Sequence, residues 1–187
     1  MSAPELKAAG FNSLVGTLRD MVPRAAYDTF VDDLPPRTRA LIVQPPLAMS
    51  WISLEDSVPV YTLAFERLFD RKPGKMFELG RAQLRADMTG IYRVFLRIAS
   101  PRTVAARTAE IYRMYTRHCG TLDVVLDQTG RLDILAEERP FASSAFYHYL
   151  RGSVFGVLEL TGVKRLAVTI VDGGGELPRC LFRVTWS

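Results

Sequence analysis

The stretch TLDVVLDQTGRLDILAE, residues 121–137, carries most of the fold prediction because it has the pattern of a β-hairpin. Two short runs rich in Val, Leu and Ile flank residues 127–130, whose composition favours a tight turn. The same pattern returns near the end of the chain, where runs at 164–171 and 179–186 flank the glycine-rich segment 172–175. We therefore predict two hairpins in the C-terminal part of the chain.

A helix is predicted between the two hairpins. Ser143–Leu160 has apolar residues at helical spacing, and Gly162 follows at a position suited to ending a helix. The order strand–strand–helix–strand–strand (ββαββ) favours an antiparallel or mixed sheet with helices on one face.

The residues before this unit predict helices almost throughout. The fourth predicted helix has a start at Ser53 that resembles a capping box, but Pro59 is unfavourable inside it, so Ser57 is an alternative start. Ser100 and Pro101 are suited to the N-cap and first position of the last one. We expect one α+β domain over residues 1–187, with a helical part over about 1–119 and the ββαββ part over about 120–187. The predicted helices are Ala8–Met21, Arg24–Leu34, Arg37–Val43, Ser53–Asp70, Lys75–Ile98 and Pro101–His118.

The composition argues against several classes of protein. Hydrophobic residues make up 48% and charged residues 24% of the 187, as in ordinary globular proteins. The net charge of +4 is modest and the arginines are scattered, so we expect no nucleic-acid binding. No apolar run approaches the roughly 20 residues of a membrane span. Two cysteines and no secretory signal favour a cytoplasmic protein.

Few residues in the sequence could support catalysis. The chain has two histidines, and His118 adjoins Cys119 at a predicted helix C-terminus, where the helix dipole would raise the pKa of the thiol. His148 lies in an aromatic run that fits either a ligand pocket or a packed core. Zinc ligands at characteristic spacings do not occur, so we expect no metal and no cofactor.

Aromatic side chains on the predicted helices suggest a different kind of site. Such residues belong more often to a core than to a pocket, but a helix layer packed on a sheet can enclose an apolar cavity. The residues that we expect to line it are Tyr92, Phe95, Tyr112, Tyr115, Phe146 and His148.

A family resemblance supports this interpretation. HYLRGSVFGVLELTG, residues 148–162, followed by a strand, a turn and Cys180–Val184, resembles the 4-vinyl reductase domain. That domain belongs to a superfamily with haem nitric-oxide-binding domains and TRAPP transport subunits. The whole chain resembles an uncharacterised family found mainly in myxobacteria, and this likeness rests on residues 30–39, 51–52, 78–81 and 90–93.

The resemblance implies a helical layer on a four- or five-stranded antiparallel sheet, often in a dimer, that binds small apolar ligands or partner proteins. The cysteine-rich metal site of the 4-vinyl reductase group is matched only at Cys180, and the Tyr-x-Ser-x-Arg motif of the haem-binding relatives is absent. We therefore expect a non-catalytic sensory or regulatory domain without zinc or haem. A protein-interaction or dimerisation module, and an enzyme using His118 and Cys119 or His148, are the alternatives.

Overall fold

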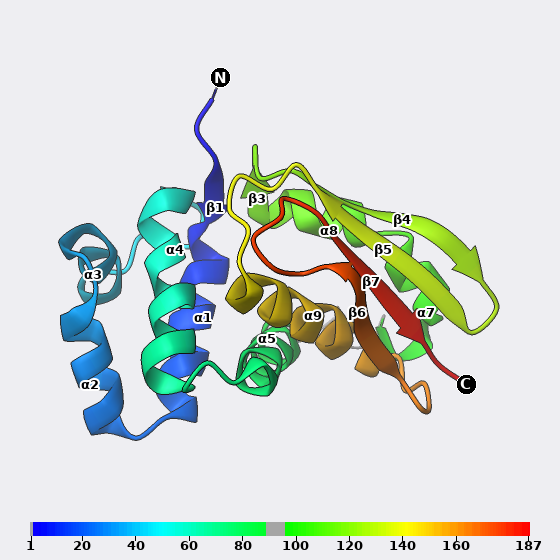
Figure 1. Ribbon diagram of the computed structural model, residues 1–187, viewed down its shortest axis with the longest axis horizontal. Helices are drawn as coiled ribbons and strands as arrows, with labels where there is room; N and C mark the ends of the chain where they lie inside the picture. The colour runs from blue at the N-terminus through cyan, green and yellow to red at the C-terminus, as the bar shows by residue number, and fades with distance from the viewer. Residues whose placement is uncertain (1, 89–95) are drawn as a thin grey trace.

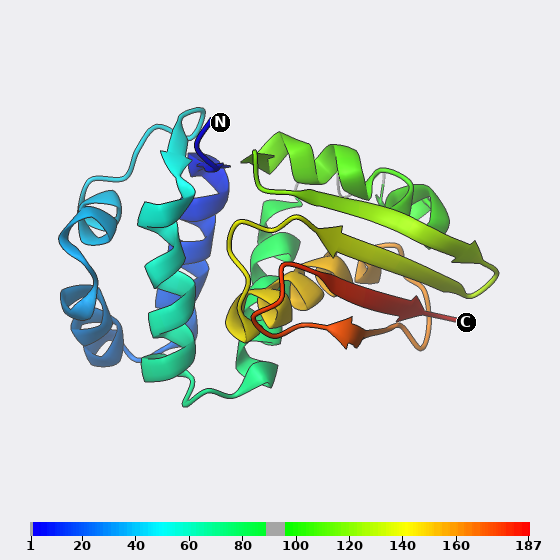
Figure 2. The ribbon, with the colours of Figure 1, turned by 45° about the horizontal axis from the view of Figure 1, so that its top comes forward.

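The computed structural model describes residues 2–88 and 96–187. The N-terminal helices, blue to cyan in Figure 1, lie beside the C-terminal sheet, and two long helices lie between these two parts. The turned view in Figure 2 shows the same arrangement. No helix of the described residues is long and apolar enough to cross a membrane.

The C-terminal part is the predicted ββαββ unit. Strands β4 (Thr121–Gln128), β5 (Arg131–Glu137), β6 (Ala167–Gly173) and β7 (Cys180–Thr185) form a sheet in the order β4-β5-β7-β6. All three pairings are antiparallel. Helix α9 (Ser144–Glu159) connects the two hairpins and contributes buried side chains to the same core as the sheet. The predicted fold class is confirmed.

The N-terminal helices agree with the sequence patterns over most of their length. Pro59 lies inside the fourth helix, and the turn that follows this helix widens into a π-helix, η1. The elements are α1 (Ala8–Met21), α2 (Arg24–Asp33), α3 (Pro36–Val43), α4 (Leu54–Leu63), η1 (Ala64–Leu68) and α5 (Pro73–Asp87).

A small second sheet was not predicted. It has the order β2-β1-β3 and joins β1 (Glu5–Lys7) to β2 (Trp51–Ser53) and β3 (Thr116–Arg117). Strands of two or three residues are too short to show an alternating pattern. The predicted helix start at Ser53 is confirmed, because α4 begins at the next residue, but the predicted capping box was wrong, since the Ser53 side chain makes no capping hydrogen bond.

Two long predicted helices end earlier than expected. The helix predicted at 101–118 is divided into α7 (Pro101–Ala105) and α8 (Thr108–Tyr115), and the chain then enters β3. The predicted cap is confirmed, since the Ser100 hydroxyl accepts a hydrogen bond from the backbone N–H of Thr103. In the range 75–98, predicted as one helix, α5 ends at Asp87 and residues 96–98 are helical again, whereas 89–95 lie outside the described residues.

Helices α5 and α9 pack so closely that only glycine fits where they touch. A Cβ added at Gly152 would lie 1.9 Å from the carbonyl oxygen of Phe77, and one at Gly80 would lie 2.1 Å from that of Tyr149. Arg81 and Glu159 join the same two helices through an ion pair of 2.6 Å. This close packing fixes α5 and α9 as two walls of the site described next.

Candidate functional site

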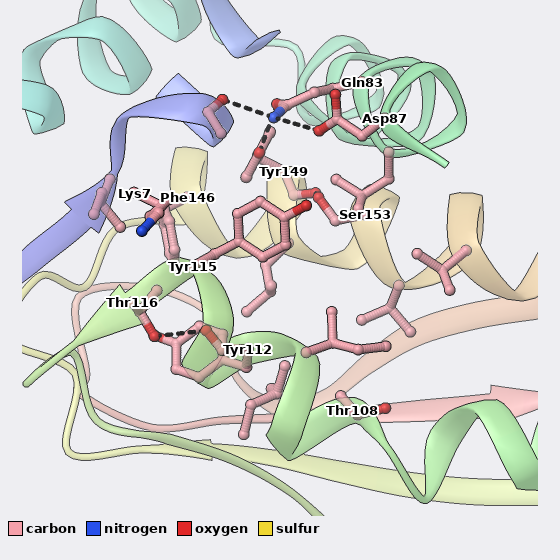
Figure 3. A pocket seen from close by; sticks show the side chains of 18 of the residues that line it. Lys7, Gln83, Asp87, Thr108, Tyr112, Tyr115, Thr116, Phe146, Tyr149 and Ser153 are labelled. Carbon is pink, nitrogen blue, oxygen red and sulfur yellow. Dashed lines mark hydrogen bonds between the residues drawn. The ribbon is translucent and has the colours of Figure 1, made fainter. Parts of the chain in front are cut away.

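A cavity of about 160 Å³ lies where α1, α5, α8 and α9 meet. Its walls are mainly apolar, with Ile111 on α8 and Leu150, Val154 and Val157 on α9 among the lining side chains. Figure 3 shows the ring of Tyr115 in the middle of this group, between α8 and α9. An apolar cavity of about 150 Å³ is large enough to hold benzene.

The α5 side of the cavity carries a hydrogen-bonded polar group. The Tyr149 hydroxyl donates to Gln83 Oε1 at 2.7 Å, and Gln83 Nε2 donates to the carbonyl oxygen of Gly10 at 2.9 Å. The Ser13 hydroxyl donates to the carboxylate of Asp87. Burial raises the pKa of the Asp87 carboxyl, and the hydrogen bonds from Ser13 and Gln83 oppose that shift. These contacts hold the wall of α5 against α1 and α9.

The opposite side of the cavity is formed by Tyr112 of α8 and Phe146 of α9. The Tyr112 hydroxyl donates to the carbonyl oxygen of Cys119 at 2.9 Å and accepts a hydrogen bond from Arg139. Burial raises the pKa of Tyr112 to about 12, against the opposing effect of the Arg139 charge. The phenol is therefore neutral at physiological pH.

Three of the six predicted site residues line this cavity: Tyr112, Tyr115 and Phe146. His148 lies on α9 but is not one of the lining residues, and its Nδ1 is buried without a hydrogen-bond partner among the described residues. Tyr92 and Phe95 lie outside the described residues. Whether any of the six contacts a ligand stays a prediction.

The sequence patterns missed the polar residues of the cavity. Gln83 and Asp87 lie four residues apart on α5, and polar residues at that spacing usually mark a solvent-facing side of a helix. In the structure Gln83 is buried, and both residues face the cavity because α1 and α9 cover that side of α5. No signal in a single sequence separates these two situations.

The region around His118 and Cys119 differs from the prediction. Cys119 follows β3 rather than a helix, so the expected effect of a helix dipole was wrong. His118 is exposed whereas Cys119 is buried, and the thiol donates to the carbonyl oxygen of Arg117 at 3.1 Å. The pKa of Cys119 is still raised, and its main cause is burial.

Both thiols are expected to react slowly in the folded protein. Cys119 and Cys180 are free and buried, and burial raises the pKa of Cys180 to about 12. Because the thiolate is the nucleophile, an aromatic disulfide reagent at mildly alkaline pH should modify the native protein at least about a hundredfold more slowly than the urea-unfolded chain. A fast native thiol at Cys119 would instead favour the enzyme hypothesis.

Known structures resemble the whole chain. An H-NOX protein used to probe heme distortion superposes with a TM-score of 0.71 and 13% identity, over 97% of this chain and 95% of that one. An unliganded Fe(II) H-NOX protein mutant from K. algicida superposes with a TM-score of 0.70 and 11% identity, over 97% of both chains. An H-NOX protein from S. oneidensis in the Fe(II)NO state superposes with a TM-score of 0.67 and 10% identity, over 97% of this chain and 99% of that one.

The chain has the H-NOX fold. Identities of 10–13% show the fold alone. No family model matches the chain, and no curated protein matches it. The predicted kinship with the 4-vinyl reductase group therefore stays a prediction.

The described residues that line the cavity of this H-NOX fold do not fit haem. Haem iron is ligated by His, Cys, Met or Tyr side chains. None of the described lining residues is His, Cys or Met, and residues 89–95 include none of these types. Burial raises the pKa of the lining phenols Tyr61, Tyr112 and Tyr149, which opposes the phenolate needed for ligation.

A metal centre is not formed elsewhere in residues 2–88 and 96–187. No group of three or more His, Cys, Asp or Glu side chains comes together there in a way that could hold a metal ion.

Proposed function

We propose that this protein is a non-catalytic sensory or regulatory domain that binds a small apolar molecule, without haem, in the cavity between α5, α8 and α9. The apolar cavity itself is the observation that carries the proposal. It lies within an H-NOX fold, whose solved examples include a protein crystallised in the Fe(II)NO state. Tyr112, Tyr115 and Phe146 would contact the ligand.

The walls of the cavity support an apolar ligand rather than a reacting substrate. Most lining side chains are aliphatic or aromatic, and the Gln83 and Tyr149 side chains satisfy each other by hydrogen bonding. Catalysis by proton transfer needs a group with a pKa near the working pH. The pKa values of the phenols Tyr112 and Tyr149 are shifted away from that range by burial, and the Asp87 carboxyl, whose pKa burial raises, is engaged by hydrogen bonds from Ser13 and Gln83 that oppose the shift.

Benzene binding to the purified full chain tests this proposal. Benzene should raise the free energy of unfolding, by about 2.7 kcal/mol at a hundred times its Kd, because only the folded state has the cavity. Native mass spectrometry of gently purified protein should also show a bound apolar molecule. No stabilisation and no bound mass would contradict the proposal, and a Soret band formed on adding hemin would contradict its haem-free form.

A second candidate function is protein interaction through a homodimer. Three large apolar side chains at the end of α3 and in the segment that follows it are strongly exposed: Val43 to 67%, Leu47 to 81% and Met49 to 77%. Clustered exposure of this kind marks interaction sites on many proteins. We expect sedimentation to give a dimer for the natural chain and a monomer for the double variant Leu47→Ser, Met49→Ser. A monomeric natural chain would remove this candidate.

A further inference from the structure

Arg139 is a buried cation without an acidic partner. The residue is only 6% exposed, and no Asp or Glu oxygen among the described residues lies within the 4.0 Å of an ion pair with it. The remaining residues, Met1 and 89–95, contain no Asp or Glu. Buried charges in proteins are normally paired, because an unpaired one loses its hydration without compensation.

Two acidic side chains of the adjoining strands pair with a different arginine, and Glu138, the residue before Arg139, is exposed. Glu137, two residues earlier in the chain, and Asp172 on β6 both pair with Arg179, at 3.6 and 2.8 Å. The buried carboxylate of Asp133 shows the usual arrangement, since Arg131 and Arg183 hold it at 2.7 and 3.0 Å. Arg139 therefore differs from Asp133, the other charged residue that is buried among the described residues.

Two aromatic rings hold the guanidinium of Arg139 in place. Its carbon lies 4.8 Å from the ring centroids of both Tyr112 and Phe146. Its Nη1 donates to the Tyr112 hydroxyl, and its backbone N–H donates to the carbonyl oxygen of Pro178 at 3.2 Å. Stacking uses the faces of the guanidinium, whereas its five N–H groups point outward in the plane. Among the described residues, one of these five N–H groups, on Nη1, donates a hydrogen bond.

The positive charge of Arg139 shifts the pKa values of the titratable groups around it. It lowers the pKa of Tyr112, Cys119 and Tyr147, each of which burial shifts upward. These are neutral side chains, so none of them balances the charge. An anion beside the guanidinium would do so.

We propose that the ligand of the cavity is an apolar carboxylate whose anionic group pairs with Arg139. This inference rests on the proposed function. Arg139 is not itself a lining residue, but Tyr112 and Phe146 each line the cavity and contact its guanidinium, so one molecule can place its apolar part in the cavity and direct its carboxylate toward the N–H edge of the guanidinium beside these two rings. There the carboxylate replaces the Tyr112 hydroxyl as the partner of Nη1.

The chemistry of the site favours a carboxylate at this end. A carboxylate matches the planar fork of one guanidinium and neutralises its single charge. The carboxylate of Asp87 lines the cavity on the side away from Tyr112, as Figure 3 shows, and it disfavours a second anion there. Lys7 also lines the cavity, but its ammonium group lies over the Trp51 ring at 4.5 Å.

The test compares hexanoate, hexanamide and acetate by calorimetry on the full chain at neutral pH. Hexanoate and hexanamide share one alkyl chain and differ in charge, while acetate carries the anionic group with almost no apolar part. We expect hexanoate to bind at least about tenfold more tightly than hexanamide, because a hydrogen-bonded charge pair forms only with the acid. Acetate should bind more weakly than hexanoate.

Variants of Arg139 give a second, independent measurement. Arg139→Gln should abolish the preference for hexanoate over hexanamide. Arg139→Lys should retain part of this preference, because the positive charge stays while the planar set of guanidinium N–H donors is lost. Arg151→Gln is the matched control. The Arg151 guanidinium stacks on Phe77 at 4.8 Å, and Phe77, unlike Tyr112 and Phe146, does not line the cavity, so the preference should be unchanged. If Arg139→Gln does not fold, the comparison of hexanoate, hexanamide and acetate on the natural chain still tests the carboxylate inference.

Each contrary result has a separate meaning. Equal binding of hexanoate and hexanamide would overturn the carboxylate inference and leave the proposed function intact. Acetate binding as tightly as hexanoate would overturn the link between Arg139 and the cavity, since it would show a free anion site. Failure of benzene and all three compounds to bind would overturn the proposed function itself.

Discussion

Replacing Gly152 with valine is expected to destabilise the fold by about 3 kcal/mol or more. A Cβ at this position would lie 1.9 Å from the carbonyl oxygen and 2.7 Å from the carbonyl carbon of Phe77. These are backbone atoms of α5, so no side chain can move aside and the two helices must separate. Because small domains have only about 5–15 kcal/mol of stability, much of the protein would then unfold on mild heating.

Urea unfolding followed by circular dichroism measures this effect. Gly16→Val is the matched control, because a Cβ at Gly16 in α1 meets nothing within 4 Å and should change stability by less than about 1 kcal/mol. Gly80→Ala should be destabilising like Gly152→Val, since its Cβ would lie 2.1 Å from the Tyr149 carbonyl oxygen. Natural stability in Gly152→Val would show that α5 and α9 lie further apart than described.

Replacing Ile111 with tryptophan is expected to weaken benzene binding by about a hundredfold, or roughly 2.7 kcal/mol. Ile111 is half-buried on α8 and lines the cavity. An indole ring is much larger than a butyl group and would occupy the volume that the ligand needs. Filling a cavity commonly stabilises a protein by about 0.5–2 kcal/mol, so the variant should remain folded.

Met114→Trp is the control for this variant. Met114 lies on the same helix but is 61% exposed and is not a lining residue, so the same large side chain should leave binding unchanged. Heteronuclear NMR titration would report both binding and folding in one experiment. Undiminished binding in Ile111→Trp would place the ligand outside this cavity.

The elements with a strong local pattern were predictable from the sequence. The runs flanking residues 127–130 became β4 and β5, and the helical spacing of Ser143–Leu160 became α9, within one residue at each end. In these segments the local preference agrees with the tertiary fold. Residues 116–117 show the opposite case, because they continue a helical pattern but pair with β1 as β3.

The site was predictable only in its aromatic part. Tyr112, Tyr115 and Phe146 were identified because aromatic residues on helices that cover a sheet commonly face the interior. Gln83 and Arg139 were missed. A sequence does not show that a polar or charged residue will be covered by segments distant in the chain, and Gln83 bonds to Gly10 while Arg139 stacks on Tyr112.

The sequence by itself determined the ββαββ unit, the succession of N-terminal helices and the scarcity of groups suited to catalysis, because these follow from local pattern and residue type. Only the tertiary structure decided that α5 and α9 pack at glycines, that α1, α5, α8 and α9 meet at a cavity, and that Arg139 is buried beside it without an acid. The physical reason is that burial and pairing depend on which distant segments meet. For Arg139 that meeting removes water from a charge and supplies no counter-charge, which is the basis for inferring a carboxylate ligand.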